Sequence, residues 1–146
     1  MAMLHDVTYR ADVVKRIHSL RPDSPRKWGK MSADQMLWHV NGALANAIGQ
    51  NDIPAMKLPM PRPIVKFMVM NLPWKKGNPT APQFVASGSY DFEGERARCL
   101  QLIDALAAKS MEGQWSDHPA FGRMSGRDVS RLHAKHVNHH LTQFGV

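Results

Sequence analysis

The chain has 146 residues, of which 43% are hydrophobic and 21% are charged, and this composition excludes a disordered protein. No stretch approaches the roughly 20 consecutive apolar residues that cross a bilayer, and the N-terminus lacks the apolar segment of a signal peptide. A single cysteine, Cys99, excludes an internal disulfide framework. We therefore expect one cytoplasmic domain over residues 1–146 that does not associate with a membrane.

The formal net charge of +7 would suit an anionic partner such as nucleic acid. The basic residues are scattered, however, with only short doublets at Arg26–Lys27 and Lys75–Lys76. Aromatic residues are not interleaved with them in a recognisable binding motif. This distribution argues against nucleic acid as a partner.

Helical signals begin close to the N-terminus. Apolar residues at helical spacing predict a first helix from about Asp6 to Leu20, with Val7 among its apolar positions. Ser32 and Gln35 form the capping-box pattern that opens a second helix. Gly49 stands where that helix is expected to end.

The middle of the chain, from residue 53 to residue 82, is rich in proline and reads either as a lid or as a long connection. A short apolar helix is expected within it, from Arg62 to Leu72. Strong helical periodicity then runs from Phe92 to about Ser110. A loop is expected over Met111–Met124, and Ser125 caps a last helix that runs to about Phe144.

Strand patterns are nearly absent, so the expected fold class is all-α. Four amphipathic helices in a chain of this size predict a four-helix bundle. The long link between the second and third main helices is able to act as a crossover connection.

Histidines gather on one face of the last helix. At about 100° per residue, His136 and His140 fall inside its apolar arc together with His133, whereas His139 falls on the edge of the arc. Burying imidazoles among valine and leucine is unfavourable unless each ring finds a partner. Since residues four apart on a helix have Cβ atoms about 5–6 Å apart, His136 and His140 can bind one metal ion. Hydrogen bonding of ordinary core histidines is the alternative.

A third metal ligand must come from elsewhere in the chain. His39 lies beside the apolar stripe of the second helix, near Met36 and Ala43, so it can point at the rim of the bundle interior. Taken alone, it would be an ordinary helix histidine. The remaining histidines have no comparable setting and are expected in loops or at the surface: His5, His18 and His118.

Three stretches carry a family resemblance: KHVNHHLTQFGV at 135–146, PRKWGKMSADQMLWH at 25–39 and, more weakly, HPAFG at 118–122. They resemble the DinB/YfiT-like superfamily of metalloenzymes, and more closely its DUF1569 branch. The resemblance implies a four-helix bundle with a crossover, often dimeric, and a divalent ion held by His39, His136 and His140. Three neutral imidazoles suit zinc, nickel, iron or copper better than magnesium or calcium.

The resemblance also implies a reaction class, because superfamily relatives include transferases and isomerases that use a small thiol. We expect metal-assisted transfer or hydrolysis, with a low-molecular-weight thiol or water as the nucleophile. No separate general base is evident: Asp34 fits a capping role, and His133 and His139 are candidates for proton carriers. The alternative is a non-catalytic binding protein that forms a homodimer through Ile64–Leu72.

Other residue types of chemical interest are expected to pack rather than react. Cys99 occupies an apolar helical position, where a cysteine is usually inert. Methionines of the middle segment could suggest copper but more often fill gaps: Met56, Met60, Met68 and Met70. The tryptophans could line a pocket, although packing is the commoner role: Trp28, Trp38, Trp74 and Trp115.

Overall fold

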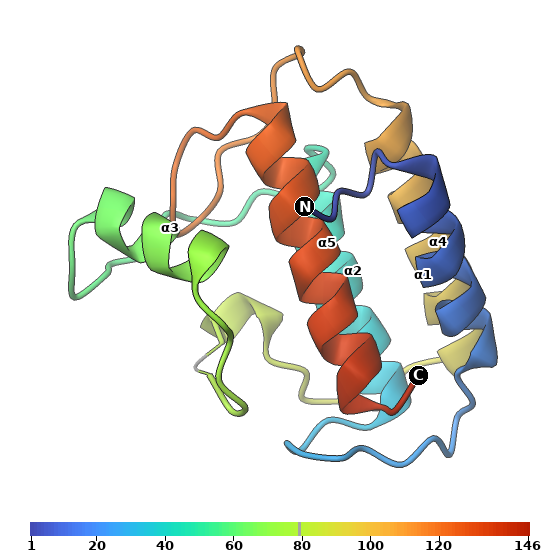
Figure 1. The fold of residues 1–146 in the computed structure, drawn as a ribbon. Coiled ribbons are helices and arrows are strands. Elements are labelled where there is room, and N and C mark those ends of the chain that lie inside the picture. Colours follow the sequence, from blue (N-terminus) through green and yellow to red (C-terminus); the bar gives the residue numbers. More distant parts are fainter. Residues whose placement is uncertain (79) are drawn as a thin grey trace.

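The computed structural model describes residues 1–78 and 80–146. Within these residues it contains five α-helices, one short 3-10 helix and no β-strand, so the predicted all-α class is confirmed (Figure 1). In chain order the elements are α1 (Val7–Ser19), α2 (Ala33–Ala47), α3 (Arg62–Asn71), η1 (Pro82–Phe84), α4 (Phe92–Ala108) and α5 (Gly126–Gln143). None of the described helices is long and apolar enough to cross a membrane.

Local hydrogen bonds fix where the first two helices begin. Asp6 caps α1, because its carboxylate accepts a hydrogen bond from a backbone N–H at 2.8 Å. The capping box predicted for α2 is present, with the Ser32 N–H donating to Gln35 Oε1 at 3.0 Å. The apolar position expected at Val7 is wrong, since this residue is 71% exposed. It precedes the buried Val13 by six residues and therefore points about 120° away from it.

Four helices pack around a hydrophobic core. α2 packs against both α4 and α5, and α1 packs against the same two helices. In Figure 1, α5 lies in front of α2, and α1 lies in front of α4. The core between them is made of aliphatic side chains that include Val13, Ile17, Leu37, Leu44, Ile103, Leu106 and Leu141. Because α2 lies against α5, residues on their facing sides are able to share one site.

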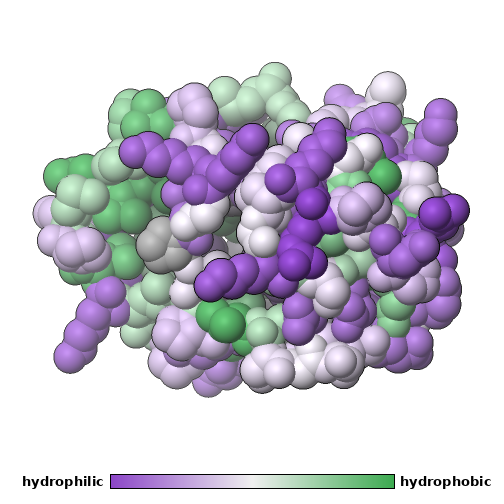
Figure 2. All heavy atoms as spheres, turned by 90° about the horizontal axis from the view of Figure 1, so that it is seen from below, coloured by the Kyte–Doolittle hydropathy of each residue, from purple (hydrophilic) through white to green (hydrophobic). Residues whose placement is uncertain are grey.

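The fifth helix, α3, lies to one side of the other four, and none of its residues is buried (Figure 1). Two lysines attach it to α5. Lys66 donates to Asp128 at 2.8 Å, and Lys135 donates to the carbonyls of Val69 and Leu72. Figure 2 shows hydrophobic surface gathered at the end of the molecule where α3 lies. The exposed apolar residues here are Met60, Ile64, Phe67, Met68 and Leu72.

The connection between α2 and α4 runs from residue 48 to residue 91 and carries α3 and η1. Near its start, the Met56 N–H donates to the Pro119 carbonyl at 2.8 Å. Near its end, the ring of Phe84 packs on α2 at Gly42, where an added Cβ would lie only 3.1 Å from that ring. The connection is therefore fixed on both sides of α3, to the loop before α5 at Met56 and to α2 at Phe84.

Candidate metal centre

Three histidines meet where α2 and α5 pack together. His39 lies in the middle of α2, and His136 and His140 lie one turn apart in the second half of α5. Their ring centroids are 4.8 to 4.9 Å apart in every pair. One ring nitrogen of each residue lies within 4.8 Å of those of the other two. The structure thus brings together the three residues singled out in the sequence, and they could hold a metal ion.

A backbone carbonyl fixes the orientation of His39. Its Nδ1 lies 2.8 Å from the Phe84 carbonyl oxygen, at the end of η1. Because a carbonyl oxygen only accepts, Nδ1 carries the proton and donates it, which leaves a lone pair on Nε2. The 3-10 helix therefore sets the tautomer of this ring.

A buried glutamine plays the corresponding part for His140. The His140 Nδ1 lies 2.8 Å from Gln143 Oε1, and Gln143 Nε2 donates to the Trp28 carbonyl at 2.9 Å. Since the amide nitrogen is used on Trp28, the amide oxygen is the group that faces His140, and it accepts the proton of Nδ1. The Nε2 of His140 is left with a lone pair as well.

The closest approach within the group joins His39 Nε2 and His136 Nε2, which are 2.9 Å apart. Since His39 Nε2 carries a lone pair, two arrangements stabilise this approach. Either His136 donates an N–H to it, or a cation binds the lone pairs of both rings. The second arrangement requires that the rings be neutral.

Burial holds the three rings in the neutral form. It lowers the pKa of His140 to about 3. Burial, followed by the neighbouring His140 and His39 rings, lowers the pKa of His136 well below the usual 6.5. Burial also lowers the pKa of His39, against the opposing effect of the Phe84 carbonyl. At pH 7 all three imidazoles are therefore neutral, which is the form that binds a metal.

Comparison with known families identifies a matching family model. The family model described as "Protein of unknown function (DUF1569)" covers residues 2–145. The chain belongs to the DUF1569 family. No curated protein and no solved structure matches this DUF1569 chain. The predicted resemblance to DUF1569 is thereby confirmed, and the match extends over nearly the whole chain.

Two further histidines of α5 lie outside the group of three. His133 is only 4% exposed, and its ring centroid lies 6.5 Å from that of His136. Its Nδ1 has no hydrogen-bond partner within the described part of the chain, and burial lowers its pKa to about 3. His139 is half-buried and packs against the rings of Trp28 and Trp74. In this DUF1569 chain His133 is a core residue, and His139 lies at the surface beside the three histidines.

His5 and His118 lie in loops, as predicted, but hydrogen bonds hold both in place. The two ring nitrogens of His5 bond to the Ser130 hydroxyl and the Lys109 carbonyl, at 2.9 and 2.7 Å. The Nδ1 of His118 accepts from two backbone N–H groups of the turn that follows it, at 3.0 and 3.3 Å. Neither residue joins the candidate centre of this DUF1569 chain, and the exposed His18 also lies outside it.

Cys99 and Asp34 have structural settings. Cys99 lies in the core on α4, where burial raises the pKa of its thiol to about 12. The Asp34 carboxylate accepts hydrogen bonds from the Ser32 hydroxyl and the Tyr90 N–H. The prediction of a packing cysteine agrees with this burial, whereas the contacts of Asp34 are not those of a helix cap, because α2 is capped by Ser32 and Gln35.

Two groups that orient the histidines, the Gln143 amide oxygen and the Phe84 carbonyl, were not predicted from the sequence. Gln143 had a usable signal, because it follows His140 by three residues and so lies on the same face of α5. The Phe84 carbonyl had none, since any residue type at that position would supply the same oxygen.

Proposed function

We propose that this DUF1569 chain is a divalent-metal-dependent enzyme in which His39, His136 and His140 hold the ion. The observation that carries the proposal is the hydrogen bonding of two rings, from which their tautomers follow. The Nδ1–H groups of His39 and His140 are bound by the Phe84 carbonyl and the Gln143 amide oxygen, so both Nε2 lone pairs are available to an ion. A metal-binding histidine almost always donates its other ring N–H to such an acceptor.

The donor set favours particular ions and leaves room for chemistry. Three neutral imidazoles, with no carboxylate in the group formed by the described residues, favour zinc, nickel or iron over magnesium or calcium. Three protein ligands leave a coordination position for water or substrate. When bound, such an ion supplies a Lewis acid that lowers the pKa of water or of a thiol. We therefore propose transfer or hydrolysis, with a small thiol or water as nucleophile.

The proposal includes the architecture of the DinB/YfiT-like superfamily. In this arrangement residues 1–146 form one domain, α1, α2, α4 and α5 form a four-helix bundle, and residues 48–91 form its crossover. Support comes from the packing, since each of the four helices contacts two of the others. It also comes from the connection, because this segment separates α2 from α4.

A second candidate function is favoured by the apolar outer face of α3. Ile64 is 50% exposed and Phe67 is 63% exposed, and exposed apolar residues in one patch suit an interface with another protein. In this alternative the chain is a non-catalytic homodimeric binding protein without a metal. His136 then donates to His39, which accounts for their 2.9 Å approach without an ion.

Metal content decides between the two functions. Tag-free protein is incubated separately with zinc, nickel or iron(II), desalted and measured by elemental analysis. The variants are His39→Ala and His136→Ala, with His18→Ala as the control because His18 is exposed and outside the group. Circular dichroism establishes that each variant keeps its helices.

About one ion per chain is expected in the wild type and in His18→Ala, with less than about a tenth of that in the two other variants. A folded wild type that binds none of the three metals would overturn the proposal, as would full occupancy in His39→Ala and His136→Ala. The oligomeric state, measured by light scattering, then tests the dimer of the second candidate.

A further inference from the structure

A small pocket adjoins the three histidines. It has a volume of about 200 Å³ and is lined by Trp28, Trp74, Lys135, Asn138, His139 and Thr142. The Trp74 ring lies 5.9 Å from that of His136, and the His139 ring lies 5.1 Å from that of His140. A molecule in this pocket would therefore lie next to the proposed metal ligands.

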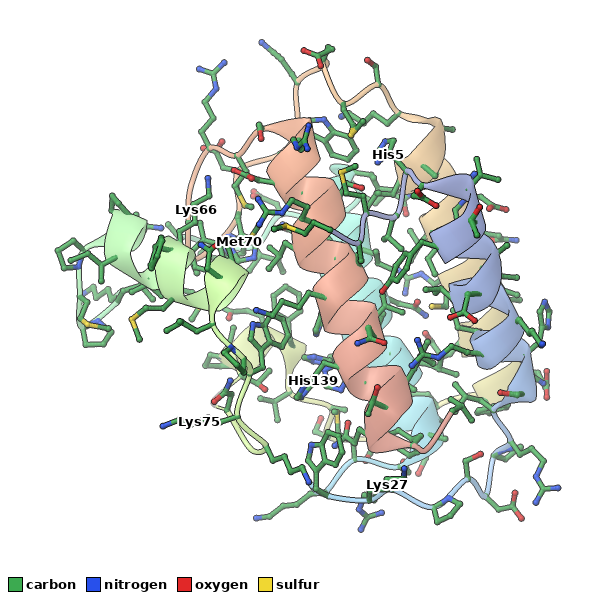
Figure 3. All side chains as sticks on the ribbon, in the orientation of Figure 1. His5, Lys27, Lys66, Met70, Lys75 and His139 are labelled. Carbon is green, nitrogen blue, oxygen red and sulfur yellow. The ribbon has the colours of Figure 1, made fainter. Side chains whose placement is uncertain are left out.

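Aromatic rings form much of the pocket wall. His139 packs against both tryptophans, with ring centroids 5.6 Å from Trp28 and 5.4 Å from Trp74. Figure 3 shows His139 on the side of α5 that faces the segment after α3, whereas Lys75 points away from it. Two indoles packed against an imidazole suit a flat or apolar molecular body.

A fixed ammonium group lies at the same pocket. Lys135 Nζ donates to the carbonyls of Val69 and Leu72 at 2.7 and 2.6 Å. These bonds use two of the three N–H donors of a lysine and immobilise the side chain, while the third donor is left for a ligand. The charge lies 5.4 Å from the centre of the Trp74 ring, at the pocket wall.

Further positive charge surrounds the pocket. The ammonium of Lys76 lies 4.8 Å from the Trp28 ring, and the Arg16 guanidinium donates to Asn138 Oδ1 at 2.8 Å. No aspartate or glutamate belongs to the lining, as far as the described residues show. Because Arg16 also pairs with Asp12 at 3.8 Å, the net positive charge at the pocket comes from Lys135 and Lys76, and it favours an anion over a cation or a neutral ligand.

We infer that this pocket binds a small carboxylate, whose apolar body lies against Trp28 and Trp74 and whose anion bonds to Lys135 and Lys76. The inference rests on the proposed function, because it assigns a substrate class to the same site. A pocket of about 200 Å³ is smaller than the roughly 300–1,000 Å³ typical of drug-sized ligands, so the molecule has about ten non-hydrogen atoms.

Two probes of equal shape test the charge requirement. Phenylacetate and phenylacetamide each have about ten non-hydrogen atoms and differ in the carboxylate, so they isolate its contribution. Each is titrated into the full chain while the indole N–H signals are followed by NMR. Lys135→Met removes a charge from the pocket lining, Lys76→Met removes the charge over the Trp28 ring, and Lys15→Met removes the same charge from the exposed side of α1. Lys76→Met is included because Lys135→Met also removes hydrogen bonds that attach α3 to α5, whereas Lys76→Met does not.

The expected result is that phenylacetate binds about tenfold more tightly than phenylacetamide and shifts the Trp28 and Trp74 signals. This preference falls below about threefold in Lys135→Met and in Lys76→Met and is unchanged in Lys15→Met. Equal affinities for the two probes in the wild type would overturn the inference. A tenfold preference that survives both pocket substitutions would overturn it as well.

The same titration on the wild type in EDTA separates the two proposals, because chelation removes any bound ion and keeps every lining residue of the pocket. The preference for phenylacetate is expected to persist without the ion. If the chain binds no metal and still prefers phenylacetate, the proposed enzyme function is wrong and the inference about the pocket stands. If the chain binds metal without this preference, only the inference about the pocket is wrong.

Discussion

Replacing Gln143 by methionine is expected to weaken metal binding between about tenfold and a hundredfold, although Gln143 itself is not a proposed ligand. The substitution keeps the length and approximate volume of the side chain. It removes the oxygen that accepts the Nδ1–H of His140 at 2.8 Å. Gln143 and His140 are 4% and 8% exposed, so little water can replace that acceptor.

The size of the effect follows from the two tautomers of His140. Without metal, the variant ring is free to place its proton on Nε2 and donate it toward the neighbouring imidazoles. A bound ion requires the Nε2 lone pair, which forces the proton onto Nδ1, where no acceptor remains. A buried donor without a partner costs about 1–3 kcal/mol, equivalent to a loss of roughly five- to 150-fold in affinity.

Competition against a chromophoric zinc chelator measures this loss, with Gln143→Glu as the matched control. Glutamate keeps an acceptor for His140, and it loses the donor to the Trp28 carbonyl just as methionine does. We expect the glutamate variant to bind zinc at least as tightly as the wild type. An affinity of Gln143→Met within about threefold of the wild type would refute the tautomer argument, provided that the variant melts cooperatively.

Three further predictions concern stability and reactivity. The pKa of His133 is lowered from 6.5 to about 3, so below pH 6.5 the unfolded chain binds more protons than the folded chain, and the free energy of unfolding decreases as the pH falls. His133→Leu removes this effect and should therefore gain about 2 kcal/mol more stability at pH 5 than at pH 7.5, measured by urea unfolding with EDTA. The Cys99 thiol, buried with its pKa raised to about 12, should react with Ellman's reagent at least about a hundredfold more slowly in the folded chain than in urea. Gly29 has φ +83°, and an added Cβ would lie 2.5 Å from Gln143 Nε2, so Gly29→Ala should lose about 1–2 kcal/mol of stability and weaken zinc binding. Gly77→Ala, with φ +77° and no atom of the described residues within 4 Å of the added Cβ, shares the strain and should leave zinc binding unchanged.

The helices were predictable because the signals that define them are local. The Asp6 cap, the Ser32–Gln35 capping box and the apolar periodicity of α4 each depend on residues within a few positions of one another. Val7 shows the limit of this reasoning. Its residue type fits an apolar stripe, but its angle on the helix directs it away from the core, and only the packing of α1 reveals which side is covered.

The candidate site was predictable to the same extent. His136 and His140 share a face of one helix, so their proximity follows from helical geometry alone. That His39 joins them depends on how α2 packs against α5, a tertiary contact that periodicity cannot supply; the family resemblance supplied it instead. The Phe84 carbonyl and the pocket wall at Trp74 come from the proline-rich connection, whose course is set by contacts distant in sequence.

A comparison of His133 with His140 on α5 bears on whether the three histidines form a metal site or are ordinary polar residues of the core. His133 and His140 are buried to almost the same degree, at 4% and 8% exposed. His133 Nδ1 has no hydrogen-bond partner in the described structure, which is unfavourable in a protein interior. His140 and His39 instead have their Nδ1–H groups bound by oxygen, with Nε2 left for the centre of the group. Burial alone does not guarantee this arrangement, as His133 shows, whereas a metal-bound histidine almost always has it, so the contrast supports the proposed metal site.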